Sequence, residues 1–305
     1  MPPGGATPSS PQPRWCARTA VRFENVRAAF VEPGEWFYDA KASKVLYRLR
    51  AGETAATLRA IAPAKRLSRL LSVDRAHDLK FEGFAFEYAD APQDGFADDP
   101  RKFNQTYRSQ SAATYDAAVG LRFAERVEFV RCRVARSGNY AFRIADGCRH
   151  VALRRCETWD TGAGGVWMGS ARQNPPNGEQ RRAILLPTEP ESCAFNVIED
   201  CRFRHGGRFN PEGTAVFVTH ASDCRIEHNE IDDWYYSGIT VGYTWGYKGS
   251  VAQRNRIAYN RISRLGQHEL SDMGGIYTLG TSFGTVVCNN VITDVFGYDK
   301  SAWGL

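Results

Sequence analysis

The chain has 305 residues, of which 43% are hydrophobic and 12% are aromatic, and it contains 28 glycines and 14 prolines. This composition supplies a core and many turns, and it is typical of a globular β protein. The net charge of +5, from 39 basic and 34 acidic residues spread along the chain, is too weak and too dispersed for a nucleic-acid track, so nucleic acid is excluded as a partner.

The N-terminal segment, residues 1–22, is rich in Pro, Gly and Ser up to about Pro13. Such a segment buries too little surface to offset its ordering entropy, so we expect it to be disordered or atypical. It lacks the apolar core that a signal peptide requires, and no apolar run in the chain approaches the roughly 18 residues that cross a bilayer. We therefore expect no membrane insertion.

The next region, residues 23–72, contains the run GEWFYDAKASKVLYRLRAGE from Gly34 to Glu53. Two stretches rich in aromatic and β-branched residues flank a polar turn at Lys41 to Lys44, which predicts two strands and a turn. We expect a small N-terminal β-hairpin that acts as a capping element.

Residues 73–305 form a repeat whose positions agree at fixed offsets. One position, here called the ladder column, holds Phe84, Cys132, Cys156, Cys201, Asn229, Asn260 and Asn290. The residues three before and two after each member are apolar except for Thr158, and the residue eight before is always small. Spacings of 48, 24, 45, 28, 31 and 30 residues define a coil of 24 to 31 residues with two longer excursions.

Repeats of this length, with short β-branched runs, glycine turns and no helical period, predict an all-β fold, the right-handed parallel β-helix. Identical residues in one column then stack about 4.8 Å apart, so that Asn members hydrogen-bond and Cys members act as small buried hydrophobes. Stacked Cys132 and Cys156 would be close enough for a disulfide, but free buried thiols are the preferred interpretation. The cysteine spacings match no metal cluster, and we expect neither a metal nor a cofactor.

The two excursions run from about Ala89 to Ala118 and from about Ser170 to Glu191. Long loops on a solenoid gather on one side and build a binding wall. Three polar and aromatic stretches on the later coils should lie above one another as a groove floor: His205 to Gly213, Asp232 to Tyr247 and His268 to Gly280.

Aromatic side chains in these stretches have flat faces that suit stacking on sugar rings. The predicted substrate-binding residues are His205, Trp234, Tyr236, Trp245 and Tyr277. Packing against loops is an equally good interpretation for each aromatic residue, because alternation along a strand sends neighbours to opposite faces.

Asp272 is the main catalytic candidate, because it sits beside a Gly-Gly step and near Tyr277 and outside any charged run. A carboxyl in such a site can be tuned for proton transfer or nucleophilic attack. The alternative is a turn Asp that caps backbone amides. Glu212, Asp233 and Glu269 are the fallback partners within the chain.

Four runs carry a family resemblance: GEWFYDAKASKVLYRLRAGE, NVIEDCRFRHGGRFNPEG, HNEIDDWYYSGITVGYTWGY and above all LSDMGGIYTLGTSFGTVVCNNVITDV. They resemble bacterial right-handed parallel β-helix repeat proteins, some of which belong to a glycoside hydrolase family that contains α-L-fucosidases and xylanases. The resemblance covers about Phe23 to Leu305 and implies a secreted or periplasmic protein. It also implies two catalytic carboxylates on successive coils, the first of which matches Asp272.

The second carboxylate of that family would follow the Trp303-Gly304-Leu305 strand start, a few residues past the C-terminus. We therefore expect a β-helix that is truncated at its C-terminus, a fragment that is inactive or nearly so on its own.

The resulting functional hypothesis is a monomeric glycoside hydrolase that acts on a polysaccharide or oligosaccharide through two carboxylates. The alternatives are a polysaccharide lyase on the same fold, or a non-catalytic carbohydrate-binding or cell-surface β-helix in which Asp272 caps a turn.

Overall fold

The computed structural model describes residues 25–59, 67–91, 110–112, 116–170, 187–244, 246–247 and 249–298. The chain divides into two compact units, Met1–Pro63 and Ala64–Leu305. Each unit is described by itself. No helix in the described residues is both long and apolar enough to cross a membrane.

The first unit contains the predicted hairpin, made of β1 (Trp36–Asp39) and β2 (Lys44–Tyr47) in antiparallel register. A short 3-10 helix, η1 (Arg27–Ala29), precedes it. The guanidinium of Arg48 lies 4.9 Å from the centre of the Phe30 ring, which in turn packs against Phe37. These contacts hold the segment before the hairpin against one of its faces.

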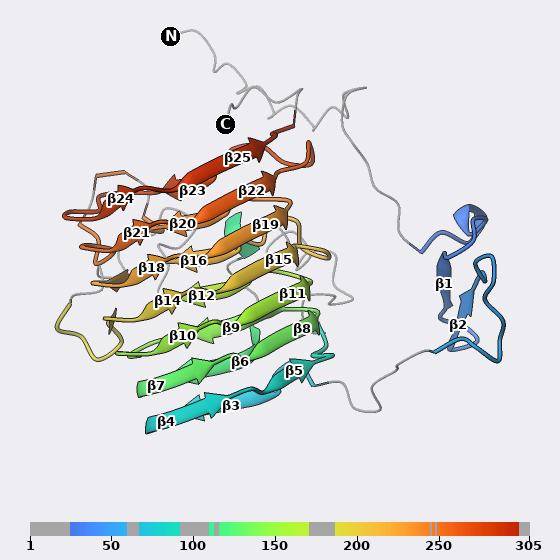
Figure 1. Cartoon of the computed structure of the whole chain (residues 1–305), viewed down its shortest axis with the longest axis horizontal. Coiled ribbons are helices and arrows are strands. Elements are labelled where there is room, and N and C mark those ends of the chain that lie inside the picture. Colours follow the sequence, from blue (N-terminus) through green and yellow to red (C-terminus); the bar gives the residue numbers. More distant parts are fainter. Residues whose placement is uncertain are drawn as a thin grey trace, which may run out of the picture. The chain divides into compact units, whose positions relative to one another are not determined.

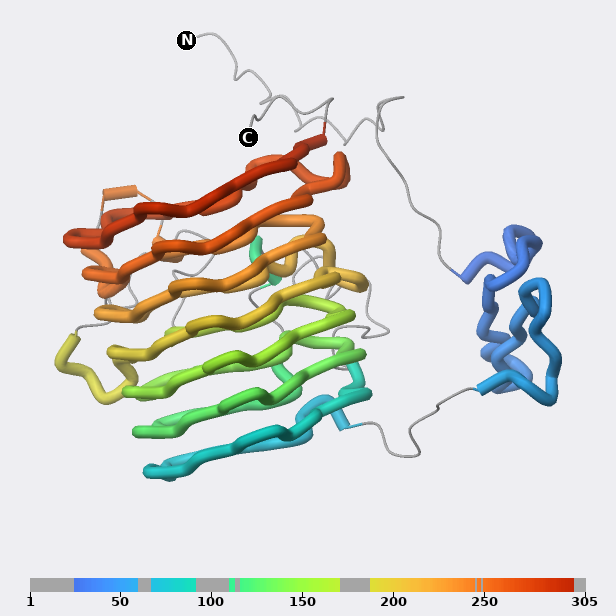
Figure 2. The backbone as a smooth tube through the Cα atoms, in the orientation of Figure 1, coloured from blue at the N-terminus to red at the C-terminus, as the bar shows by residue number. Residues whose placement is uncertain are grey.

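The second unit consists of three parallel sheets of seven strands each, which the chain visits in turn (Figures 1 and 2). The first sheet comprises β3 (Leu71–Asp74), β6 (Ala117–Arg122), β9 (Tyr140–Ile144), β12 (Val166–Met168), β16 (Val216–Val218), β20 (Ile239–Val241) and β23 (Ile276–Thr278). The second comprises β4 (His77–Glu82), β7 (Glu125–Val130), β10 (Ala152–Arg154), β14 (Val197–Glu199), β18 (Arg225–Glu227), β21 (Arg256–Ala258) and β24 (Val286–Cys288). The third comprises β5 (Ala85–Glu87), β8 (Arg133–Ser137), β11 (Glu157–Thr161), β15 (Arg202–Gly206), β19 (Glu230–Trp234), β22 (Arg261–Leu265) and β25 (Val291–Val295). The predicted parallel β-helix is confirmed.

The ladder column lies between the second and third sheets, with its members stacked in adjacent coils. The backbone N–H of Asn229 donates to Asn260 Oδ1 (3.0 Å), and that of Asn260 donates to Asn290 Oδ1 (2.9 Å). Lower in the column, the backbone N–H of Cys156 donates to Cys201 Sγ (3.4 Å). The predicted stack of three Cys and three Asn is therefore confirmed, and its cysteines are free thiols.

A second ladder lies at the start of the second sheet, five residues before the first. Asn196 Oδ1 accepts from the backbone N–H of Val151, and Asn255 Oδ1 accepts from that of Cys224. The sequence analysis missed this column because Val127 and Val151 occupy it in the lower coils, so its polar character appears only in the later ones.

The core fills the space between the three sheets with inward-facing aliphatic and aromatic side chains. Trp234 belongs to this core and is fully buried. Its register partner one coil below is Gly206, where a Cβ would lie 2.1 Å from the Trp234 ring. The glycine thus leaves the space that the indole fills, and its ring N–H donates to the Phe203 carbonyl.

The outer face of the first sheet is also buried in part. Trp167 and Phe217 point outward from β12 and β16, yet they are 4% and 0% exposed. They pack in a second apolar cluster with Tyr140, Tyr243 and Ala112. Ala112 ends a short 3-10 segment, η3 (Gln110–Ala112), so part of the first excursion covers this face.

Candidate functional site

Glu212 and Asp272 lie at matching positions of the third turn, the segment that joins a strand of the third sheet to the next strand of the first sheet. Glu212 lies between β15 and β16, and Asp272 lies between β22 and β23. Each stands four residues before the strand that follows it, Val216 or Ile276. One strand, β20, separates β16 from β23, so the two turns lie about 10 Å apart along the helix axis.

Asp272 is exposed and has a left-handed backbone, with φ of 55°. Two tyrosine hydroxyls donate to it: Tyr277 Oη to Asp272 Oδ1 (2.9 Å) and Tyr236 Oη to the Asp272 carbonyl oxygen (2.8 Å). Burial and the hydrogen bond to Asp272 both raise the pKa of Tyr277. A neutral phenol therefore holds the carboxylate, a second phenol holds the backbone carbonyl, and the side chain stays accessible.

Glu212 is mostly buried. Burial raises the pKa of its carboxyl above the ordinary value, and a hydrogen bond with its own backbone opposes this only in part. The neighbouring Gly213 packs so closely on the coil below that a Cβ there would lie 2.6 Å from the Ala163 carbonyl carbon. A buried carboxyl with a raised pKa holds its proton at higher pH, as a general acid requires.

The segment Gln110–Ala112 meets the same region from the first excursion. Gln110 Nε2 donates to the hydroxyl oxygen of Tyr236 (2.9 Å) and lies 3.5 Å from that of Tyr277. The hydroxyl of Tyr243 donates to the Gln110 carbonyl oxygen (3.0 Å). Burial raises the pKa of Tyr243 to about 12, which keeps this hydroxyl a donor at neutral pH.

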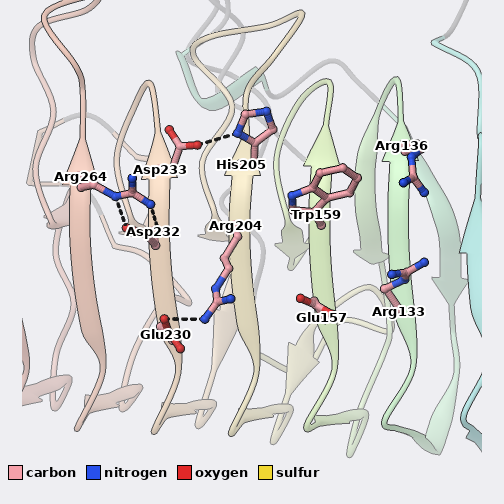
Figure 3. A pocket seen from close by; sticks show the side chains of 10 residues that line it. All are labelled: Arg133, Arg136, Glu157, Trp159, Arg204, His205, Glu230, Asp232, Asp233 and Arg264. Atoms are coloured by element: carbon pink, nitrogen blue, oxygen red, sulfur yellow. Dashed lines mark hydrogen bonds and ion pairs between the residues drawn. The ribbon is translucent and has the colours of Figure 1, made fainter. Parts of the chain in front are cut away.

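A second polar region lies on the outer face of the third sheet, where a hollow of about 590 Å³ opens to solvent (Figure 3). Its lining residues are Arg133, Arg136, Glu157, Trp159, Arg204, His205, Glu230, Asp232, Asp233 and Arg264. Trp159 lies on β11 between Arg136 of β8, 4.8 Å from its ring centre, and the stacked ring of His205 on β15. Each face of the indole therefore has a neighbour, although the side chain is still 36% exposed.

The charges on this face are paired with one another. Asp233 contacts His205 Nδ1 (2.6 Å) and Arg208 Nη2 (2.6 Å), Arg204 contacts Glu230, and Arg264 contacts Asp232. Burial works to raise the pKa of Asp233, but donors from Arg208, His205 and Gln267 hold it at about 2. Acidic and basic side chains on neighbouring strands of this face therefore form ion pairs, and Asp233 is held as an anion.

The predicted substrate-binding residues separate into different places. Tyr236 and Tyr277 meet at Asp272, whereas His205 lies on the third-sheet face with Trp159 and Asp233. Trp234 is buried in the core, because the strand alternation turns it inward over Gly206, so the structure corrects its expected place in a groove.

The remaining predicted residues are Trp245 and Glu269. Trp245 lies outside the described residues. Glu269 is exposed on the same turn as Asp272. No cluster of three His, Cys, Asp or Glu side chains that could hold a metal occurs among the residues described.

Sequence reasoning missed Gln110 and Tyr140 as parts of the site. Both contribute to the covered outer face of the first sheet, where the Tyr140 hydroxyl donates to the Ser111 carbonyl. The sequence pointed to this part of the site only through the first excursion. That excursion was predicted to build a binding wall, but no residue in it was predicted to reach the groove.

Comparison with known proteins adds one finding. No family model and no curated protein matches the sequence. A solved structure titled "Glycoside hydrolase" is similar, with a TM-score of 0.73 and 23% identity, over 92% of this chain and 51% of that one. The chain thus spans about half the length of that structure, and the similarity is one of fold.

Proposed function

We propose that this protein hydrolyses glycosidic bonds, with Glu212 as the general acid and Asp272 as the second carboxylate. The observation that carries the proposal is the pair itself: two carboxyls stand on the same turn two coils apart, in opposite environments. Glu212 is partly buried, which raises the pKa of its carboxyl, and Asp272 is exposed and held by tyrosine hydroxyls. Glycoside hydrolysis needs one protonated and one ionised carboxyl on either side of the bond.

Asp233 and Glu269, the other two fallback partners, suit the role of the acid less well. Asp233 has a pKa of about 2 and is bound by Arg208 and His205, so it cannot supply a proton near neutral pH. Glu269 is exposed.

The substrate class is a polysaccharide or oligosaccharide. The similar structure's title and the resemblance to a family with fucosidases and xylanases both support it. Tyr277 is partly exposed beside Asp272, and it supplies a hydroxyl group and a ring edge that suit sugar recognition, whereas Tyr236 is 4% exposed and packs in the core.

The test is hydrolysis of aryl L-fucosides and xylo-oligosaccharides by the wild type, Asp272→Asn and Glu212→Gln. We expect Asp272→Asn to lower turnover by about 10² to 10⁴ on every substrate that the wild type cleaves. Glu212→Gln should lose as much on oligosaccharides but little on an aryl glycoside with a good leaving group, which needs no acid. Glu269→Gln is the matched control on the same turn, and its turnover should stay unchanged.

Four results would contradict this assignment. Full turnover by Asp272→Asn would exclude that residue, and full turnover by Glu212→Gln would place the acid elsewhere. Binding of these sugars without cleavage would favour a carbohydrate-binding protein, and unsaturated uronate products would favour a lyase.

A further inference from the structure

The segment Gln110–Ala112 is fixed on the outer face of the first sheet by two hydroxyl groups. Tyr140 of β9 donates to the Ser111 carbonyl, and Tyr243, just after β20, donates to the Gln110 carbonyl (3.0 Å). Ser111 and Ala112 are fully buried and have left-handed φ of 61° and 49°. A backbone in this region is costly for residues other than glycine, so the contacts must hold it in place.

The Gln110 side chain links this anchored segment to Asp272 through two tyrosine hydroxyls. Its Nε2 donates to the oxygen of Tyr236 at 2.9 Å and approaches that of Tyr277 at 3.5 Å. Each tyrosine hydroxyl has one hydrogen to donate. Tyr236 donates its hydrogen to the Asp272 carbonyl oxygen, and Tyr277 donates its hydrogen to the Asp272 carboxylate. The direction is therefore consistent along the network, from amide to phenol to Asp272.

We propose that Gln110, Tyr236 and Tyr277 are positioning residues that hold the backbone and the carboxylate of Asp272 in one orientation, so that the first excursion completes the site. The functional meaning of this network rests on the catalytic role proposed for Asp272. Without the two hydroxyls an exposed aspartate samples several rotamers, and a catalytic carboxylate needs one. Gln110 removes the remaining freedom by fixing the lone pairs, and hence the O–H directions, of both phenols.

A packing role for the same residues is the competing explanation, because Tyr243 and Ala112 belong to an apolar cluster. The two roles differ in how the groups titrate. Burial raises the pKa of Tyr277 first, and Asp272 raises it further, whereas the Gln110 donor lowers it. A packing role predicts no such dependence on the polar atoms of Asp272 and Gln110.

The first experiment follows the ionisation of Tyr277 by NMR with carbon-labelled tyrosine, with the signal assigned by its absence in Tyr277→Phe. We expect Asp272→Asn to move the Tyr277 titration to lower pH by about half a unit or more, and Gln110→Met to move it to higher pH. Methionine keeps the length of glutamine and removes the donor. Tyr259→Phe, an exposed tyrosine stacked on His228, is the control and should leave the titration unchanged.

Opposite shifts in two folded variants, with thermal midpoints near that of the wild type, would establish the network. An unchanged Tyr277 titration in both variants would overturn it. Because this readout needs no substrate, it is independent of whether the protein is a hydrolase.

The second experiment uses the glycoside that the wild type cleaves. Gln110→Met and Tyr277→Phe should lower kcat more than they raise KM, because both variants loosen the hydrogen bonds that orient Asp272 for the transition state. A rise in KM with kcat unchanged would contradict positioning. If Asp272→Asn keeps full turnover while the NMR shifts are seen, the proposed function fails and the network remains.

Discussion

Asp233 and Asp272 show how one backbone conformation serves two kinds of aspartate. Both have left-handed φ, 63° and 55°, and both lie at or near the third turn. Asp233 contacts the charged Arg208 and the imidazole of His205, whereas the contacts of Asp272 are two neutral tyrosine hydroxyls. A carboxylate in a tight charged network stabilises the fold, and one held by neutral donors at the surface remains available to a ligand.

The pairing of Asp233 predicts a pH-dependent stability. Its pKa falls from an ordinary 3.8 to about 2 in the folded chain, so the folded state binds the proton less tightly than the unfolded state. The stabilisation is therefore complete above about pH 4 and is lost as pH falls towards 2. Asp233→Asn should reduce the free energy of unfolding by about 2 kcal/mol at pH 7, with a smaller difference at pH 3.

Urea unfolding of both proteins at pH 7, 4 and 3 measures this effect. Asp294→Asn is the control, because Asp294 has the same backbone conformation two coils further on and is exposed. Its cost should stay within about 0.5 kcal/mol. An Asp233→Asn cost that does not change with pH would contradict the ion-pair account.

Among the elements, the ladder column stabilises the corner between the second and third sheets. Asn260 accepts from the backbone N–H of Asn229, and its Nδ2 donates to the Ile226 carbonyl (2.9 Å) in a buried site. Asn260→Ala would leave both backbone groups without a partner, and each such group costs about 1 to 3 kcal/mol. We expect the free energy of unfolding to fall by about 2 to 4 kcal/mol.

Equilibrium denaturation measures that loss. Asn289→Gly is the matched control, because Asn289 is the exposed neighbour of the column with φ of 54°, which glycine adopts without strain. A cost for Asn260→Ala no larger than that of the control would show that the ladder contributes little.

The elements also explain why the fold could be predicted and the site only in part. Columns such as Cys201 and Asn229 recur at each coil because every coil meets the same corner, so the pattern is visible in one sequence. Trp234 lies on β19 in register with Leu265, so its inward position follows from the repeat. The third turn differs in length between coils and does not repeat, so the distance of His205 from Tyr236 could not be read from it. Gln110 comes from an excursion between β5 and β6, where no periodic pattern exists.

At the scale of the whole molecule, the stacked coils of the second unit make stability depend on neighbours. A strand in the middle of a sheet, such as β15, pairs on both sides, whereas β25 pairs only with β22 among the described residues. The side chains two residues after each member of the ladder column show this difference. Ile231 is fully buried, and Ile292 at the same position two coils further on is 43% exposed. In a solenoid, local opening should therefore proceed from coils with one neighbour.

This decrease in burial from the middle coils to the coil of β25 predicts both hydrogen-exchange rates and the cost of mutations. Backbone amides of β11, β15 and β19 should exchange slowest, with those of β24 and β25 faster, because the first three strands pair on both sides and β24 and β25 pair on one side among the described residues. Ile231→Ala should cost about 2 to 5 kcal/mol, as truncation in a closed core does, and Ile292→Ala about 1 kcal/mol or less, since its side chain is already half open to solvent. Mass-spectrometric exchange on the intact chain and denaturation of the two variants measure both quantities. If β25 proves as protected as β19 and Ile292→Ala as costly as Ile231→Ala, then that coil is covered in solution, and the gradient in burial does not describe the molecule.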